Sequence, residues 1–319
     1  MQVFYDTAEL KFPSNSVVTI GTFDGVHLAH QKILKSVTTA AKQAGGQSIV
    51  ITFWPHPKTV LTDGKEIPLL LSTQEEKINL LEQNNIDILL ILPFTKEFSL
   101  WGAEKFLKEL LIEKIHAKKI VLGYDHHFGN KREGNIQYLK EKQAALGFDL
   151  EEISKQLIED AAISSTNIRK AIYEGDCTLA QKLLGRPYSF TGTIIKGNQL
   201  GRTIGFPTAN IHINEEYKLI PKNGVYAVEV ELHDKHIHTS PHNRYFKGML
   251  NIGHRPTVNG KNLSIEVNIF DFDEDIYGER LTVKLIERLR DEQKFNGLEG
   301  LMAQLKTDKE NTLTIFQIR

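Results

Sequence analysis

The chain has almost no cysteine, no long apolar run and almost no net charge. Its 319 residues include a single cysteine, Cys177, which excludes a disulfide within the chain. No apolar run approaches the roughly 20 residues that a membrane-spanning helix needs, and the N-terminal MQVFYDTAEL lacks the basic start and apolar core of a signal peptide. A formal net charge of -1 argues against a general nucleic-acid binder. We therefore expect a soluble cytoplasmic protein with small-molecule ligands and with no nucleic acid, membrane or obligate protein partner.

The first half of the chain alternates apolar β-branched runs with amphipathic helical patterns. We expect strands at 16–20, 48–53, 87–94 and 118–123, and helices over 27–44, 73–84 and 101–117. Two short helices are expected next, broken at Gly175 and ended at Gly185. This alternation predicts an α/β domain with a Rossmann-like parallel sheet and right-handed crossovers.

After Pro187 the pattern changes to short alternating segments. They lie at 189–195, 224–233, 245–253, 263–272 and 281–290, and they predict a C-terminal antiparallel β-barrel. A covering helix is expected over 298–317. We place the domain boundary near Pro187, which gives domains 1–187 and 188–319.

The segment GTFDGVHLAH, residues 21–30, follows the first apolar strand and opens a helix. In a parallel sheet this position is a site for anions, because free backbone N–H groups and the positive end of the helix dipole meet there. His27 and His30 lie about 60° apart on a helical wheel, so both imidazoles can reach one phosphate group. Two histidines three residues apart also form an ordinary helix face. The surrounding glycines and Asp24 favour the phosphate site.

Three other segments accompany it. AAISSTNIRKAI places Ser164, Ser165 and Thr166 before a helix and Arg169 in its first turn, where they can cap the helix or bind phosphate. TFWPHP, residues 52–57, is expected to hold His56 in an extended loop, and GYDHHFG offers Asp125, His127 and Phe128 at the same sheet edge. Each segment taken alone is also compatible with a rigid turn.

In type and order, these four segments resemble the adenylyltransferase module of bacterial bifunctional riboflavin kinase/FAD synthetases, over about 165 residues. The resemblance implies that FMN and ATP react to give FAD and pyrophosphate, with His27 and His30 stabilising charge on the ATP phosphates. The implied ligand sets are Gly21, Thr22, Phe23, Asp24, Ser165, Thr166 and Arg169 for ATP, and His56, Pro57 and Asp125 for the flavin.

Ala29 departs from the H-x-G-H signature of that group, which has glycine at this position. On the helical wheel Ala29 points about 130° from the bisector of the two histidines, so its methyl group should not block them. We therefore expect a working site, with any effect of Ala29 falling on ATP affinity.

The second half contains KGNQLGRTIGFPTAN, residues 196–210, which lacks the ending of a Walker A loop. Pro207 restrains an extended segment, and Thr208 and Asn210, two residues apart, should project to one side as oxygen ligands for Mg²⁺. A glycine-rich hairpin without ligands is the alternative. In SIEVNIF, Ile265, Val267 and Ile269 alternate with polar residues that include Glu266. The Glu266 carboxylate is either a solvated surface group or, if it faces a cavity, a general base.

This half resembles the riboflavin kinase module over about 130 residues, from GRPYSFTGTI to LRDEQKF. The resemblance assigns Thr208 and Asn210 to Mg-ATP and Glu266 to the base that activates the terminal ribityl hydroxyl of riboflavin. We expect Gly197, Gly201, Arg202 and Gly205 to lie along the ATP phosphates. Asn268 replaces a histidine common in the family, which affects a secondary contact.

The leading hypothesis is a bifunctional enzyme that converts riboflavin to FMN and FMN to FAD with ATP and Mg²⁺. A second hypothesis keeps the kinase and makes the first domain a degraded, non-catalytic module, and a third takes the barrel as an oligonucleotide-binding module. Two further metal sites are open alternatives to solvated loops: the acidic turn DFDEDIYG, and the histidines His236, His238 and His242.

Overall fold

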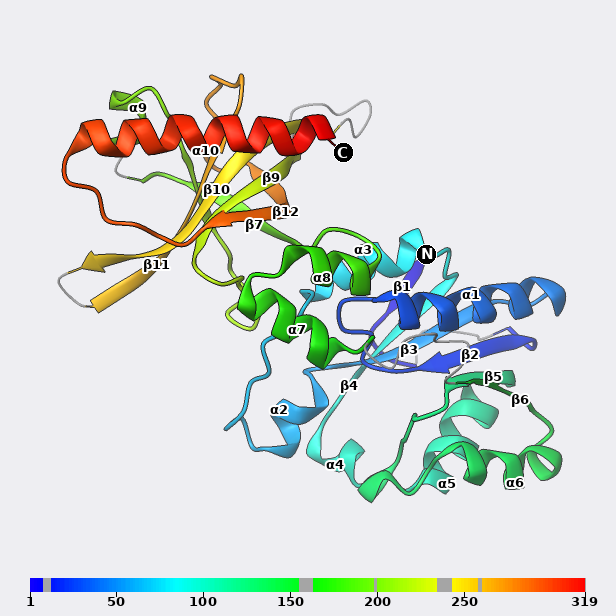
Figure 1. Cartoon of the computed structure of the whole chain (residues 1–319). Helices are drawn as coiled ribbons and strands as arrows, with labels where there is room; N and C mark the ends of the chain where they lie inside the picture. Colours follow the sequence, from blue (N-terminus) through cyan, green and yellow to red (C-terminus); the bar gives the residue numbers. More distant parts are fainter. Residues whose placement is uncertain (8–12, 155–162, 198–199, 234–242, 258–259, 319) are drawn as a thin grey trace. The chain divides into compact units, whose positions relative to one another are not determined.

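A computed structural model describes residues 1–7, 13–154, 163–197, 200–233, 243–257 and 260–318. The chain forms two compact units, Met1–Ser165 and Thr166–Arg319, which are described separately below. Figure 1 shows the helices and strands of each unit.

The first unit is built on a six-stranded parallel sheet. The strands are β1 (Gln2–Phe4), β2 (Ser16–Ile20), β3 (Ser48–Trp54), β4 (Ile88–Pro93), β5 (Ala117–Gly123) and β6 (Asp149–Ile153), in the order β1-β4-β3-β2-β5-β6. After β2, the chain adds β3 and β4 on one side of β2. It then returns and adds β5 on the other side of β2. The strand order therefore reverses between β2 and β5, which is where open α/β sheets bind their ligands.

Alternate residues of these strands pack against helices on opposite faces of the sheet (Figure 1). On one face, Val17 and Val50 belong to apolar clusters with α1 (Leu28–Gln43) and α3 (Gln74–Gln83). On the other face, Val18 and Ile49 pack with α6 (Ile136–Leu146) and a π-helical segment, η1 (Phe106–Lys114). Shorter helical elements complete the unit: α2 (Pro57–Leu61), α4 (Lys96–Ser99), α5 (Ala103–Lys105) and η2 (Asn130–Arg132).

The second unit is a closed six-stranded barrel in the order β10-β11-β8-β7-β12-β9, with antiparallel neighbours. Its strands are β7 (Ser189–Ile195), β8 (Ala209–His212), β9 (Gly224–His233), β10 (Arg244–Thr257), β11 (Gly260–Ile269) and β12 (Arg280–Arg290). A single helical turn, α9 (Leu200–Thr203), interrupts the connection from β7 to β8.

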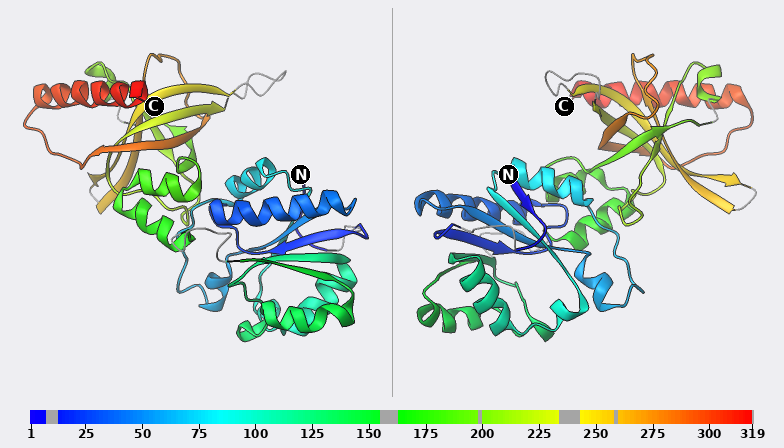
Figure 2. Two further views of the ribbon diagram at one scale, coloured as in Figure 1. Left: turned by 45° about the vertical axis from the view of Figure 1, so that its right-hand side comes forward. Right: turned by 180° about the vertical axis from the view of Figure 1, so that it is seen from behind.

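Helix α10 (Leu298–Ile318) lies along the barrel in both views of Figure 2. Its Asp308, 1% exposed, accepts hydrogen bonds from the Arg290 guanidinium on β12 at 2.7 and 3.0 Å, and Gln304 donates another at 2.9 Å. This bidentate pair fixes the helix to the barrel wall. Helices α7 (Ser165–Glu174) and α8 (Cys177–Leu184) precede the barrel, separated at Gly175 (φ 83°) and ended by Gly185 (φ 76°).

The predicted fold class is confirmed: a parallel sheet with helices, followed by an antiparallel barrel with a C-terminal helix. Sequence patterning missed β1 and β6, which are short edge strands, and β6 carries the polar sequence DLEEI. It also missed α6. The boundary near Pro187 stays a prediction. No helix among the described residues is both long and apolar enough to cross a lipid bilayer.

Candidate functional site: two nucleotide pockets

The segment 21–27 forms a strained turn between β2 and α1. Phe23, Gly25 and Val26 all have positive φ angles, of 47°, 76° and 38°. A β-branched residue such as Val26 rarely adopts this conformation, and such strain persists only where the surroundings enforce it. The enforcing contacts are apolar: the Phe23 and Val26 side chains, 2% and 0% exposed, are packed in the core.

The two predicted histidines meet at the start of α1. His27 is the N-cap residue, and its Nδ1 accepts a hydrogen bond from the His30 backbone N–H at 3.4 Å. The imidazole rings are stacked, with centroids 3.6 Å apart and an angle of 14° between their planes. The helical wheel assumed that both residues are helical. In the structure His27 has the extended conformation of an N-cap residue, and its ring stacks on that of His30.

Burial and the neighbouring His27 hold the pKa of His30 well below its usual value. The His30 Nδ1 atom is itself buried and has no hydrogen-bond partner among the described residues. The His30 imidazole is therefore neutral near pH 7, and the binding of an anion here would favour its protonation.

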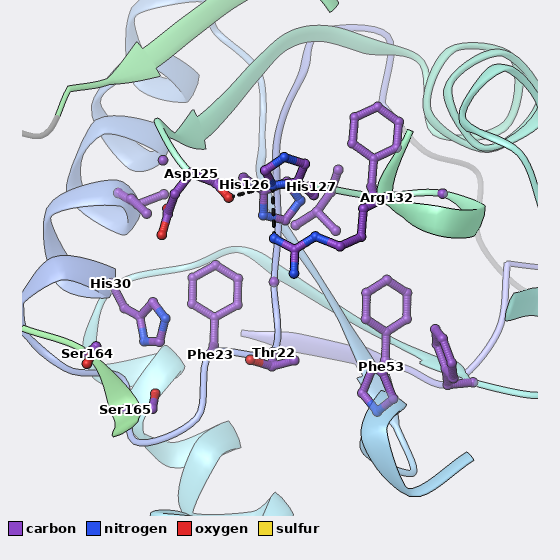
Figure 3. A pocket seen from close by; sticks show the side chains of 18 of the residues that line it. Thr22, Phe23, His30, Phe53, Asp125, His126, His127, Arg132, Ser164 and Ser165 are labelled. Atoms are coloured by element: carbon purple, nitrogen blue, oxygen red, sulfur yellow. Dashed lines mark hydrogen bonds between the residues drawn. The ribbon is translucent and has the colours of Figure 1, made fainter. Parts of the chain in front are cut away.

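These histidines line a pocket of about 530 Å³ at the reversal point of the sheet (Figure 3). The predicted Gly21, Thr22, Phe23, Pro57, Asp125 and Ser165 also line it, together with Ala29 and Ser164. The structure thus brings together parts of all four segments that the sequence singled out.

One wall of this pocket consists of aromatic side chains, of which sequence reasoning had singled out only Phe128. They are Phe53, Phe94, Phe98, Trp101, Phe106 and Phe128. Their rings contact one another in tilted and edge-to-face pairs with centroids 5.1 to 6.1 Å apart. Such a wall suits a flat conjugated ring. Its members come from three separate stretches of sequence, so no local motif could have revealed it.

The segment GYDHHFG contributes a polar edge above the pocket in Figure 3. His127 Nδ1 lies 2.8 Å from the Asp125 carbonyl oxygen and 3.1 Å from a nitrogen of Arg132. Burial lowers the pKa of His126 to about 4, so this imidazole is neutral. Arg132, which the sequence analysis did not name, places a cation at the mouth of the pocket.

Other predicted ligands lie outside the pocket lining. The Asp24 carboxylate, 2% exposed, accepts hydrogen bonds from the backbone N–H groups of Leu71 (2.9 Å) and Ser72 (3.2 Å), so it braces the turn. His56 caps α2, which begins at Pro57, so the expected extended loop is wrong beyond His56. Direct roles for both side chains stay predictions.

The predicted triphosphate residues divide between the two units. The Ser165 hydroxyl donates a hydrogen bond to the Asp24 carbonyl oxygen at 3.1 Å, which ties the start of α7 to the strained turn. Thr166 and Arg169 belong to the second unit. Their contact with the triphosphate stays a prediction.

In the barrel, Glu266 on β11 is held by two hydroxyl groups. Ser264 donates to Oε1 at 2.7 Å, and Thr208 donates to Oε2 at 3.3 Å. Glu266 and Asn210 are directly opposite each other on β11 and β8, so their side chains share a face of the sheet. The predicted base and both predicted metal ligands are thus neighbours.

Two pockets meet at Thr208. A pocket of about 560 Å³ is lined by Arg202, Pro207 and Thr208, and by the acidic turn from Phe272 to Tyr277. A second pocket, of about 300 Å³, is lined by Gly201, Thr208 and Glu266, and by residues of α10. A phosphate donor in the larger pocket and a hydroxyl acceptor in the smaller one would meet beside Thr208 and Glu266.

The glycines of this segment allow close backbone approach. A Cβ atom on Gly197 would lie 2.2 Å from the Asn210 amide, and one on Gly201 would lie 2.2 Å from the Phe206 carbonyl oxygen. Asn268, 7% exposed, donates a hydrogen bond to the Pro207 carbonyl oxygen at 2.6 Å and so positions the residue before Thr208. Gly205 adopts a φ of 79°.

Comparison with known proteins finds two enzyme families along the chain. Residues 9–167 match the FAD synthetase family model and residues 184–316 match the riboflavin kinase model. A bifunctional riboflavin kinase/FMN adenylyltransferase of Listeria monocytogenes is 42% identical over 95% of this chain and 93% of its own length. The enzyme of the same name in Escherichia coli is 35% identical, over 94% and 92%. The chain belongs to the bifunctional riboflavin kinase/FMN adenylyltransferase family.

A solved structure spans the same two units. A crystal structure described as a macrolide-efflux protein from Streptococcus pneumoniae has a TM-score of 0.85 and 33% identity, with 97% of each chain covered. The similarity supports the architecture of this family member over its whole length. Nothing in the comparisons favours a degraded FAD synthetase domain.

Ala29 is the departure of this FAD synthetase domain from the H-x-G-H signature. Its side chain, 7% exposed, packs with Val17, Val121 and Ile153 and also lines the pocket. We expect Ala29→Gly to change the rate of FAD formation less than about tenfold and to lower the free energy of unfolding by about 1 kcal/mol, because glycine disfavours helix. Steady-state kinetics with varied ATP and a urea titration check both. A hundredfold gain in activity would contradict the expectation.

The additional metal site at the acidic turn is not supported by the described residues. The described ranges hold no group of three or more His, Cys, Asp or Glu side chains arranged to bind a metal, and Glu274 in the acidic turn is paired with Arg244 at 2.6 Å. His236, His238 and His242 lie outside the described residues.

Lys77 on α3 is a buried charged residue that sequence reasoning missed. It is 6% exposed, and burial lowers its pKa from 10.5 to about 8, although Asp24 acts in the opposite direction. Its apolar neighbours Ile78, Leu80 and Leu81 gave the helical pattern but no sign that the lysine itself would be buried.

Between pH 8 and 10.5 the unfolded chain keeps the Lys77 proton that the folded chain has released. The contribution of this group to the free energy of unfolding therefore rises with pH in that window, by at most about 3 kcal/mol. We expect Lys77→Met to be more stable than the wild type at pH 7.5, with the difference shrinking by pH 10. Urea titrations of both proteins at the two pH values check this, and a difference independent of pH would contradict it.

Proposed function

We propose that this chain phosphorylates riboflavin to FMN in the barrel and adenylylates FMN to FAD in the first unit, using ATP in both steps. The observation that carries the proposal is that each unit contains a pocket lined by side chains that suit the handling of phosphate. In the first unit these are the His27–His30 pair, which lines the same pocket as the aromatic wall. In the barrel they are Thr208 and Glu266 at the junction of two pockets.

In the kinase step, ATP occupies the larger barrel pocket and riboflavin the smaller. Glu266 accepts the proton of the terminal ribityl hydroxyl as its oxygen attacks the γ-phosphorus of ATP. The bond from that phosphorus to the bridging oxygen of ADP breaks, and ADP leaves. The hydrogen bonds from Ser264 and Thr208 hold the carboxylate in place for this proton transfer.

The groups beside Glu266 fit a magnesium ion. The Thr208 hydroxyl and the Asn210 amide oxygen are hard ligands, and they lie next to a carboxylate on one face of the sheet. Mg²⁺ keeps several waters and takes further oxygens from the phosphates, so two protein ligands suffice. Bound there, the ion would neutralise charge on the ATP phosphates.

In the adenylyltransferase step, the flavin ring lies against the aromatic wall and its phosphate faces the α-phosphorus of ATP. A phosphate oxygen of FMN attacks that phosphorus, and pyrophosphate leaves. The start of α1 and the imidazoles of His27 and His30 offer donors to the negative charge on the phosphate oxygens. Because His27 Nδ1 accepts a hydrogen bond, the proton of its neutral ring lies on Nε2.

Incubation with FMN, Mg²⁺ and labelled ATP tests the adenylyltransferase half directly. We expect FAD and pyrophosphate in equal amounts. The absence of both products, with FMN formation from riboflavin intact, would support the degraded-module hypothesis. A parallel reaction with riboflavin tests the kinase half.

A further inference from the structure

Lys77 faces the strained phosphate turn from helix α3. It lies one helical turn before Leu81, so the two side chains share a face of the helix. Leu81, 0% exposed, packs in the same apolar cluster as Phe23 and Val26, the two non-glycine residues of the turn with positive φ. The Lys77 side chain, 6% exposed, is therefore on the face of α3 that packs toward this cluster, and Lys77 does not line the pocket.

The segment before α3 holds the same turn through hydrogen bonds. Asp24 accepts from the backbone N–H groups of Leu71 and Ser72, and the Gly25 N–H donates to the Ser72 hydroxyl at 3.1 Å. The turn is thus hydrogen-bonded to the segment that leads into α3, which Thr73 caps.

The charge of Lys77 acts on both the turn and α1. Asp24 in the turn attracts the ammonium group, and His30 on α1 is kept neutral partly by it. His27, stacked on His30, is the third titratable group on this side.

We propose that Lys77 is a positioning residue of the adenylyltransferase site, whose buried positive charge balances Asp24 and so holds the strained turn and its histidine pair in the geometry that binds the ATP phosphates. Burial of a charged ammonium group destabilises a fold. A lysine that served stability alone would be replaced by an apolar side chain with a gain. The free-energy cost of burying the Lys77 charge is explained if that charge serves the adenylyltransferase site. This inference rests on the proposed adenylyltransferase function.

Lys77→Met separates the two roles, because methionine fills a similar volume without charge. We expect the melting temperature of Lys77→Met at pH 7.5 to rise by several degrees, while kcat/KM for FAD formation falls about tenfold or more, with riboflavin phosphorylation unchanged. Lys77→Arg, which keeps the charge, should retain most of the activity. Lys35→Met, at an exposed lysine on α1, is the matched control and should change neither quantity.

A pH profile gives a second readout. FAD formation by the wild type should fall as pH rises through about 8 and approach the level of Lys77→Met, whereas Lys77→Arg should keep its activity over that interval. At each pH, the ratio of the wild-type rate to the Lys77→Arg rate removes the effect of substrate titration, because both enzymes use the same substrates.

Two results would overturn the proposal. If the Lys77→Met protein is less stable and less active, Lys77 has a structural role. If it keeps full FAD formation, Lys77 has no role in the site.

Equilibrium binding of ATP to the same variants distinguishes failure of the Lys77 proposal from failure of the proposed function. A wild type that binds ATP but makes no FAD contradicts the adenylyltransferase assignment, while the ratio of ATP affinities still tests Lys77.

Discussion

Glu266→Gln lowers the rate of FMN formation from riboflavin by about 10²–10⁴-fold, the range expected for loss of a general base. Glutamine keeps the shape of the side chain: its oxygen can still accept a hydrogen bond from one of the Ser264 and Thr208 hydroxyls, and its NH2 group can donate to the other, but it cannot take a proton from the ribityl hydroxyl. The effect should fall on kcat, with little change in KM for riboflavin, because the pocket is unchanged. Steady-state kinetics with separated FMN and FAD measure it.

FAD formation from supplied FMN is the internal control for this variant. It should proceed at the wild-type rate, because Glu266 lies in the barrel and the adenylyltransferase pocket in the first unit. If both activities fell together in a protein with an unchanged unfolding curve, the assignment of two separate sites would be wrong.

His30→Asn should impair the other reaction: FAD formation falls while riboflavin phosphorylation is retained. We expect FAD formation from FMN to fall by about 10²–10³-fold, the size of effect seen when one preorganised donor to a developing oxyanion is removed. The change also removes the stacked partner of His27 and the ring that packs 5.0 Å from Phe23. The rate of pyrophosphate release with saturating FMN measures the loss.

Gln31→Ala is the matched control for the His30 variant. Gln31 follows His30 on α1, and its side chain donates a hydrogen bond to the Val26 carbonyl oxygen at 2.9 Å, so the change disturbs the same turn without removing an imidazole. We expect at most a tenfold effect from Gln31→Ala. A His30→Asn variant with wild-type FAD formation would remove His30 from the mechanism.

The sequence predicted the elements whose apolar pattern is strong and local. The strand at Val17 and Val18 and the helix that carries His27 to His30 were both found, because β-branched runs and three-and-four spacing depend on near neighbours. The carboxyl end of a buried strand next to a helix start is also a local signal, and several residues chosen there line a pocket, while their phosphate role stays a prediction. Spacing alone left Glu266 and Thr208 with structural alternatives, and the family resemblance decided their predicted roles.

What the sequence could not show depends on contacts between distant segments. The aromatic wall joins Phe53, Phe98 and Phe128 from different strand ends, and no spacing links them. Asp24 was chosen because it lies in the motif; no spacing could show that its carboxylate accepts hydrogen bonds from the N–H groups of residues 71 and 72, and its role toward phosphate stays a prediction. Lys77 looked like a polar helix residue and is buried.

The most direct test of the two-site account combines the two inactive variants in one reaction with riboflavin, ATP and Mg²⁺, with FMN and FAD resolved by mass. The account predicts that Glu266→Gln alone makes neither product, that His30→Asn alone stops at FMN, and that the mixture makes FAD through released FMN. FAD formation at the wild-type rate by either variant alone, or a mixture that accumulates FMN without FAD, would contradict it.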